Sequence, residues 1–157
     1  MLRLGTFGKV ELVHGVPRFR GMRWVTVLRE LSNLADGRAE SPGESVLRLR
    51  WIDLGLPTPQ PQVPVTLPGG RTAYLDLGTE RVRFAAEFHG WEWHSSTRQV
   101  QHDDDRLALV EAEGWVVRPV WGANLWGPDA DVDAILHRGL IEARQRFGAR
   151  VLHARRH

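Results

Sequence analysis

The sequence predicts a single α/β domain built on a mixed four-stranded sheet with flanking helices. Apolar, β-prone runs at residues 62–67, 71–77 and 81–88 follow one another closely, which favours three consecutive antiparallel strands. A helical stretch separates them from a fourth apolar run at residues 115–121, as in a crossover connection. We therefore expect the order helix, three strands, helix, strand, helix, with helices on the faces of the sheet.

The N-terminal part offers weaker signals. Residues 1–20 alternate loosely between apolar and polar residues and are interrupted by glycines, so we expect a small β-hairpin or an irregular arm. Residues 22–35 carry apolar side chains at spacings of three and four, which predicts a helix. We divide the chain into an arm with a helix (1–38), a main domain (39–148) and a basic tail (149–157).

Ser41 is expected to start the first helix of the main domain. Its hydroxyl suits the N-cap position, Pro42 suits the first turn, and Glu44 stands three residues after the cap, as in a capping box. Gly55 is expected to end this helix.

Turn residues and apolar runs set the remaining elements. Pro64 suggests that the first strand lies at an edge of the sheet. The glycines at 69–70 mark a hairpin turn, and a second turn is expected at 78–80. Two further helices are predicted, one at 95–113 and one at 128–147.

Composition excludes several classes of protein. Of 157 residues, 42% are apolar and 25% are charged, as in an ordinary globular chain rather than a disordered one. No run approaches the roughly 18 apolar residues of a membrane span, and the first residues lack a signal-peptide pattern. The absence of cysteine excludes disulfides and cysteine zinc sites, so we expect no zinc and a cytoplasmic location.

Charge is distributed unevenly. Residues 1–30 hold six Lys or Arg against two acids, and residues 137–157 hold six Arg against one acid. Residues 31–136 hold nine basic residues against sixteen acids. Basic ends around an acidic centre suit a DNA backbone bound at the flanks and a cation bound between them, although arginine-rich ends are equally typical of solvated faces.

Two carboxylates, Asp76 and Glu87, interrupt apolar strands. A buried carboxylate must be paired or must coordinate a metal, whereas either acid alone could simply face solvent. Because the two acids stand on consecutive strands, we expect them to share a Mg²⁺ ion, with Mn²⁺ as a substitute. The pattern predicts a metal-dependent phosphodiesterase site.

Other polar residues surround this pair. His89 follows Glu87 by two residues, so strand alternation puts both on one face, and its pKa suits proton transfer from water. His94 could protonate a leaving group or contact phosphate. Glu44 could add a third carboxylate through water, although its capping role alone would explain it.

Asp103 interrupts a helical stripe formed by Val100, Leu107 and Val110. An acid on an inward face commonly orients another group, and a histidine is the expected partner. The alternative, an acid favoured by the start of a helix, suits Asp103 less because it stands about two turns in.

These residues carry a resemblance to a known family. The pattern Glu44 … Asp76 … Glu87-Phe88-His89 resembles the PD-(D/E)XK nuclease superfamily, whose shared core is a helix, three strands, a helix and a strand. The run His89-Gly90-Trp91-Glu92-Trp93-His94, followed by Asp103 and Gly114-Trp115-Val116-Val117, is similar to the very-short-patch-repair (Vsr) endonucleases and their relatives, which include homing endonucleases with a Glu, Asp, x-His, Asp pattern. The match covers roughly residues 40–125.

The resemblance implies a restriction-endonuclease-like αβββαβ core and a DNA endonuclease activity. Asp76 would be the principal metal ligand, assisted by the carboxylate of Glu87 and the backbone carbonyl of Phe88. His89 would stand where the superfamily usually has lysine and would activate water.

Two more roles are implied: Asp103 would pair with a histidine, and Glu44 would lie in the outer shell of the metal. The structural zinc of the repair enzymes has no ligands here, so their mismatch specificity does not transfer. Two other functions remain open at this point, a non-catalytic DNA-binding or toxin–antitoxin regulatory domain on a decayed nuclease fold, and an RNA nuclease.

Overall fold

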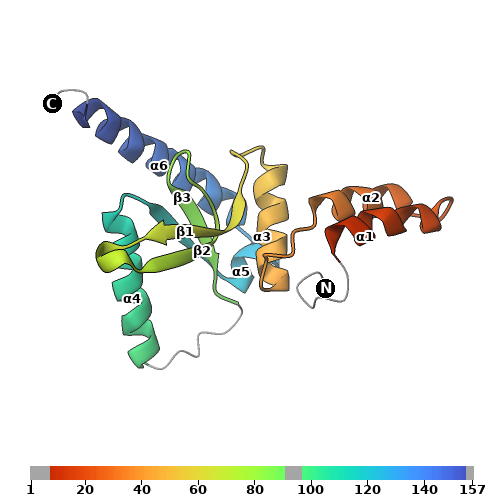
Figure 1. The fold of residues 1–157 in the computed structure, drawn as a ribbon, viewed down its shortest axis with the longest axis horizontal. Helices are drawn as coiled ribbons and strands as arrows, with labels where there is room; N and C mark the ends of the chain where they lie inside the picture. Colours follow the sequence, from red (N-terminus) through yellow and green to blue (C-terminus); the bar gives the residue numbers. More distant parts are fainter. Residues whose placement is uncertain (1–7, 91–96, 155–157) are drawn as a thin grey trace.

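A four-stranded sheet with the order β1-β2-β3-β4 forms the centre of the molecule (Figure 1). The computed structural model describes the backbone of residues 8–90 and 97–154 and the side chains of residues 8–90 and 105–147. The strands are β1 (Gln60–Thr66), β2 (Thr72–Thr79), β3 (Phe84–Phe88) and β4 (Val116–Val120). The pairs β1–β2 and β2–β3 are antiparallel, and β3–β4 is parallel. The predicted mixed sheet is confirmed, with β1 at its edge.

The helices flank this sheet and precede it. They are α1 (Lys9–Gly15), α2 (Val25–Leu34), α3 (Pro42–Asp53), α4 (Thr97–Ala112), α5 (Gly122–Leu125) and α6 (Val132–Ala154), with 3₁₀ turns η2 (Val16–Phe19) and η3 (Pro68–Gly70). The observed order of α3, the first three strands, α4, β4 and α6 is the predicted one.

Two apolar clusters cover the two faces of the sheet. On one face, Leu47 and Trp51 of α3 pack with Leu136 of α6 against β3 and β4. On the other face, Val110 of α4 packs against β1 and β2, together with Trp115. Burial of each such side chain contributes about 1.5–3 kcal/mol, so the sheet is held rigidly between α4 and the α3–α6 layer.

Residues 9–19 form α1 and η2, so the β-hairpin or irregular arm predicted for this region is wrong over the part that the structure describes. Gly8 forms the N-cap of α1, and its backbone N–H donates a 2.6 Å hydrogen bond to Oε2 of Glu11. Helix α1 lies alongside α2, and the pair extends outward from α3 (Figure 1). Val16 is buried between them. A helix of seven residues is marginal by itself, so packing against α2 decides its structure.

Smaller differences concern where elements begin and end. Strand β3 begins at Phe84, because residue 83 has a left-handed φ of 53° and closes a turn onto the carbonyl of Glu80. Helix α5 lies between the predicted strand at 115–121 and the predicted helix at 128–147, and α6 continues past the expected end near Phe147. No described helix combines the length and apolarity that a membrane span requires.

Candidate functional site

Asp76 and Glu87 meet where β2 and β3 lie side by side. Leu77 pairs with Ala86 at the last position of the antiparallel ladder, so Asp76 and Glu87 are the residues next to this pair on their two strands. The backbone N–H of Phe88 donates a 2.9 Å hydrogen bond to Oδ2 of Asp76, which fixes this carboxylate at the end of β3.

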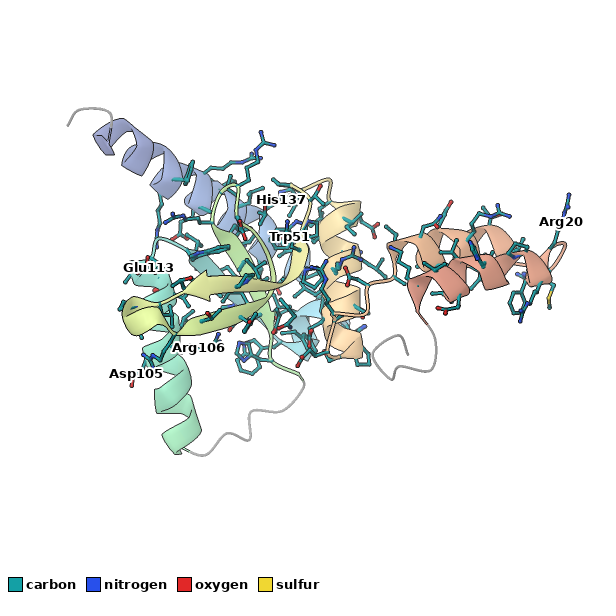
Figure 2. All side chains as sticks on the ribbon, viewed as in Figure 1. Arg20, Trp51, Asp105, Arg106, Glu113 and His137 are labelled. Carbon is teal, nitrogen blue, oxygen red and sulfur yellow. The ribbon has the colours of Figure 1, made fainter. Side chains whose placement is uncertain are left out.

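Glu87 forms an ion pair with an arginine of α4. Nη2 of Arg106, on α4, lies 2.9 Å from Oε1 and 2.8 Å from Oε2 of Glu87. Nη1 of the same guanidinium donates to the carbonyl oxygen of Tyr74 at 3.3 Å. Figure 2 shows Arg106 where α4 runs beside the β1–β2 hairpin. One arginine therefore joins α4 to both strands that carry the acids.

Glu44 approaches from α3. The hydroxyl of Ser41 accepts a hydrogen bond from the backbone N–H of Glu44 at 3.1 Å, which confirms the predicted cap. The carboxylate of Glu44 accepts from the backbone N–H of Glu40 at 2.7 Å, one residue before the N-cap that a standard capping box would use. Glu44 is only 8% exposed. The cap thus turns an acid inward at the start of α3.

Gly43 allows this close approach. A Cβ built at position 43 would lie 2.1 Å from an atom of the Phe88 ring, a distance that real contacts do not reach. The start of α3 is therefore pressed against the end of β3, next to the backbone group that binds Asp76.

The three acids influence one another electrostatically. The pKa of Asp76 is raised from 3.8 to about 6, chiefly because burial disfavours the charged form. The negative charges of Glu44 and Glu87 act in the same direction, whereas the hydrogen bond from Phe88 and the positive charge of Arg106 oppose them. Carboxylates from α3, β2 and β3 thus lie within electrostatic reach of each other.

The donor set suits a magnesium ion. Among the side chains that the structure describes, no group of three or more His, Cys, Asp and Glu is arranged to hold a metal. Mg²⁺ does not require such a group, because it retains several waters and is commonly held by one or two carboxylates. Asp76 and Glu87 are two carboxylates on adjacent strands, and both oxygens of Glu87 are bonded to Arg106.

His89 follows Phe88, the last residue of β3. Its backbone N–H donates to the carbonyl oxygen of Val120 at 2.9 Å, which continues the pairing of β3 with β4. Its exposed imidazole rests on the ring of Trp121, with 4.6 Å between ring centroids. The ring of Phe88, one residue earlier, packs edge-on against Trp126 at 5.9 Å. Aromatic residues after β4 therefore hold the end of β3 in place.

An open cleft of about 610 Å³ adjoins the site between the β1–β2 hairpin and α4. Arg71, Thr72, Asp105 and Arg106 contribute to its lining. Arg106 therefore belongs both to the acidic site and to a cleft that is open to solvent.

Two predicted site residues fall outside the described side chains. His94 lies outside the described residues, and Asp103 lies on α4 where only the backbone is described. The structure brings together Glu44, Asp76 and Glu87, whereas the described contact of the His89 ring is with Trp121. The sequence reasoning missed Arg106, although its spacing of three from Asp103 indicates a shared helix face.

No family model matches this chain, and no solved structure matches it. The chain is similar to two uncharacterised proteins of Mycobacterium tuberculosis, one from each of two strains, and is 38% identical to each over 119 residues. Those residues make up 76% of this chain but 44% of each relative, so the chain spans less than half the length of the curated relatives that it matches. The chain is thus similar to one part of a longer mycobacterial protein.

Proposed function

We propose that this protein is a Mg²⁺-dependent DNA endonuclease of the Vsr-like type. The observation that carries the proposal is the convergence of Asp76 and Glu87 from adjacent strands, with Glu44 buried beside them. Three carboxylates gathered at one end of a sheet cost free energy, which the guanidinium of Arg106 offsets at Glu87. A bound divalent cation would offset the negative charge that remains at Asp76 and Glu44, and this supports the proposal.

Each residue has a role in this proposal. Asp76 and Glu87 would hold the cation, the Phe88 carbonyl would be a further ligand, and Glu44 would lie in its outer shell. When bound, Mg²⁺ stabilises the charge that develops on the phosphate during hydrolysis. His89 would take a proton from the attacking water, because it follows Glu87 by two residues and its imidazole, packed on Trp121, is exposed to solvent.

The test is nicking of supercoiled plasmid in Mg²⁺. Asp76→Asn keeps the shape of the side chain and an acceptor for the Phe88 N–H, but removes the charge, so cleavage should fall by at least about 10²-fold. Glu111→Gln, which removes an exposed acid of α4, is the matched control and should cleave like the wild type. Equal cleavage by Asp76→Asn and the wild type would rule out the assignment.

A second candidate is a non-catalytic DNA-binding domain on the same fold. It is favoured by the pairing of both oxygens of Glu87 with Arg106, which satisfies this acid without a metal. Tight DNA binding in EDTA, combined with no cleavage of DNA or RNA in Mg²⁺ or Mn²⁺, would support it over the endonuclease.

A further inference from the structure

The ion pair between Arg106 and Glu87 is enclosed by the fold. The side chains of Arg106 and Glu87 are 28% and 9% exposed, whereas those of Arg50 and Asp133, on α3 and α6, are 46% and 44% exposed. The contact geometry of the two pairs is nearly the same, because Nη2 of Arg50 also lies 2.9 and 3.0 Å from both oxygens of Asp133. The two pairs therefore differ in burial and in location rather than in bonding.

Arg106 supplies the positive charge that the cluster needs in the absence of a metal. Its charge lowers the pKa of Asp76, in opposition to the charges of Glu44 and Glu87. Both oxygens of Glu87 are occupied by Nη2 of Arg106. A divalent cation on Glu87 would repel the guanidinium and would need the same lone pairs, so cation and arginine compete for one carboxylate.

We propose that Arg106 is a latch, by which we mean a positioning residue that holds Glu87 while no cation is bound. When a divalent cation binds to Glu87, Arg106 releases this carboxylate. The guanidinium of Arg106 then becomes available to the phosphate backbone of DNA. This inference rests on the proposed function, and it assigns to Arg106 a role in ordering the two binding events.

The surroundings of Arg106 give the released guanidinium a place to act. It lines the open cleft between the β1–β2 hairpin and α4, together with Arg71. A guanidinium forms the same charge-assisted hydrogen bonds with phosphate oxygens as with a carboxylate. If Arg106 exchanges Glu87 for a phosphate group, its guanidinium therefore keeps the same kind of hydrogen bonds. The two arginines that line the cleft, Arg71 and Arg106, suit binding of a polynucleotide strand.

The latch makes cation binding and DNA binding cooperative. A cation that frees Arg106 raises the affinity for DNA, and by linkage DNA raises the affinity for the cation by the same factor. Coupling of this kind is commonly about 5–150-fold. Removal of Arg106 should abolish the coupling and, in addition, should strengthen cation binding in the absence of DNA because a competitor is gone.

The experiment compares the wild type, Arg106→Gln and Arg50→Gln. The Mg²⁺ midpoint is measured by thermal-shift titration without DNA, and affinity for a labelled duplex is measured by fluorescence anisotropy in EDTA and in Ca²⁺, which replaces Mg²⁺ to suppress cleavage. We expect Arg106→Gln to bind Mg²⁺ at least about 5-fold more tightly than the wild type and to lose the Ca²⁺-dependent gain in DNA affinity. Arg50→Gln should match the wild type in both measurements.

Unchanged or weaker Mg²⁺ binding by Arg106→Gln would overturn the latch, because a merely structural arginine would weaken the site. Arg106→Lys keeps the positive charge but binds a carboxylate through a single ammonium group, so this variant should bind Mg²⁺ with an affinity between those of the wild type and Arg106→Gln. If Arg106→Gln does not fold, the Mg²⁺ affinity of Arg106→Lys tests the latch instead. Asp76→Asn separates the two proposals. If this variant binds Mg²⁺ like the wild type, the proposed cation site is wrong. If Asp76→Asn loses Mg²⁺ binding but Arg106→Gln does not bind Mg²⁺ more tightly than the wild type, only the latch is refuted.

Discussion

The backbone N–H of Phe88 donates its hydrogen bond to the carboxylate of Asp76, so a side chain of β2 binds the end of β3. This bond anchors an acid at a position where burial and two neighbouring carboxylates oppose its ionisation. The effect of this ionisation on the free energy of unfolding can be measured, and so can the contributions of neighbouring residues to the position of Asp76.

The stability of the protein should depend on pH through Asp76. Its folded pKa of about 6 exceeds the usual 3.8, so the folded state binds the proton more tightly and stability falls as pH rises from about 4 to 6. Asparagine does not ionise, so the stability of Asp76→Asn should not fall over this pH range. It should match the wild type near pH 4 and be more stable at pH 8 by about 2–3 kcal/mol in EDTA, as measured by urea unfolding. An equal or lower stability of the variant at pH 8 would contradict the assignment.

Glu44→Gln should lower the pKa of Asp76. The substitution removes a negative charge that raises this pKa but keeps an oxygen that can accept from Glu40. We expect a lower pKa of Asp76, measured by NMR from the titration of its carboxyl carbon. Glu111→Gln serves as the control, and an Asp76 titration that is identical in wild type and Glu44→Gln would show that the two acids are not coupled.

Gly43→Ala should destabilise the protein. The added methyl group would overlap the Phe88 ring, and overpacking of this kind costs about 1–3 kcal/mol in free energy of unfolding. Gly15→Ala is the matched control, because a Cβ there meets no atom within 4 Å and its φ of −76° suits alanine. It should be neutral or slightly stabilising. Comparable losses at both positions would argue against a close contact between α3 and β3.

Ser41→Ala should cost about 1 kcal/mol, because the N-cap hydroxyl is lost from the start of α3. Ser45→Ala removes an exposed hydroxyl four residues later, 3.3 Å from the carbonyl of Ser41, and should change stability by less than about 0.5 kcal/mol. Thermal unfolding of the two variants measures the difference, and a larger effect at Ser45 would be inconsistent with capping by Ser41.

Local signals made much of this fold predictable. The cap at Ser41 and the proline at 42 act on the next turn of chain, so they located α3 correctly. Apolar runs with tight turns located the strands, and the pairing of consecutive strands then brought Asp76 close to Glu87. These features depend on residues that are neighbours in sequence or on adjacent strands, which is where pattern reasoning is strongest.

Features that depend on distant contacts were not predictable. Helix α1 is too short to be stable alone and owes its structure to α2, so its sequence read as an irregular arm. Arg106 looked like a surface residue because its partners, Glu87 and the carbonyl of Tyr74, lie 19 and 32 positions away in the chain. Nothing in the local pattern of α4 specifies which strand an arginine will reach.

The contact between Gly43 and Phe88 ties the choice of residue at one position to the size of the other. Because only a hydrogen atom fits between the backbone at 43 and the aromatic ring, any bulkier residue at 43 requires a smaller one at 88. The approach of Glu44 to Asp76 is then set by steric fit between residues 43 and 88, against the repulsion between the two acids. A chain of this fold that exchanges both residues together can keep its acids equally close, whereas one that changes only residue 43 must move them apart.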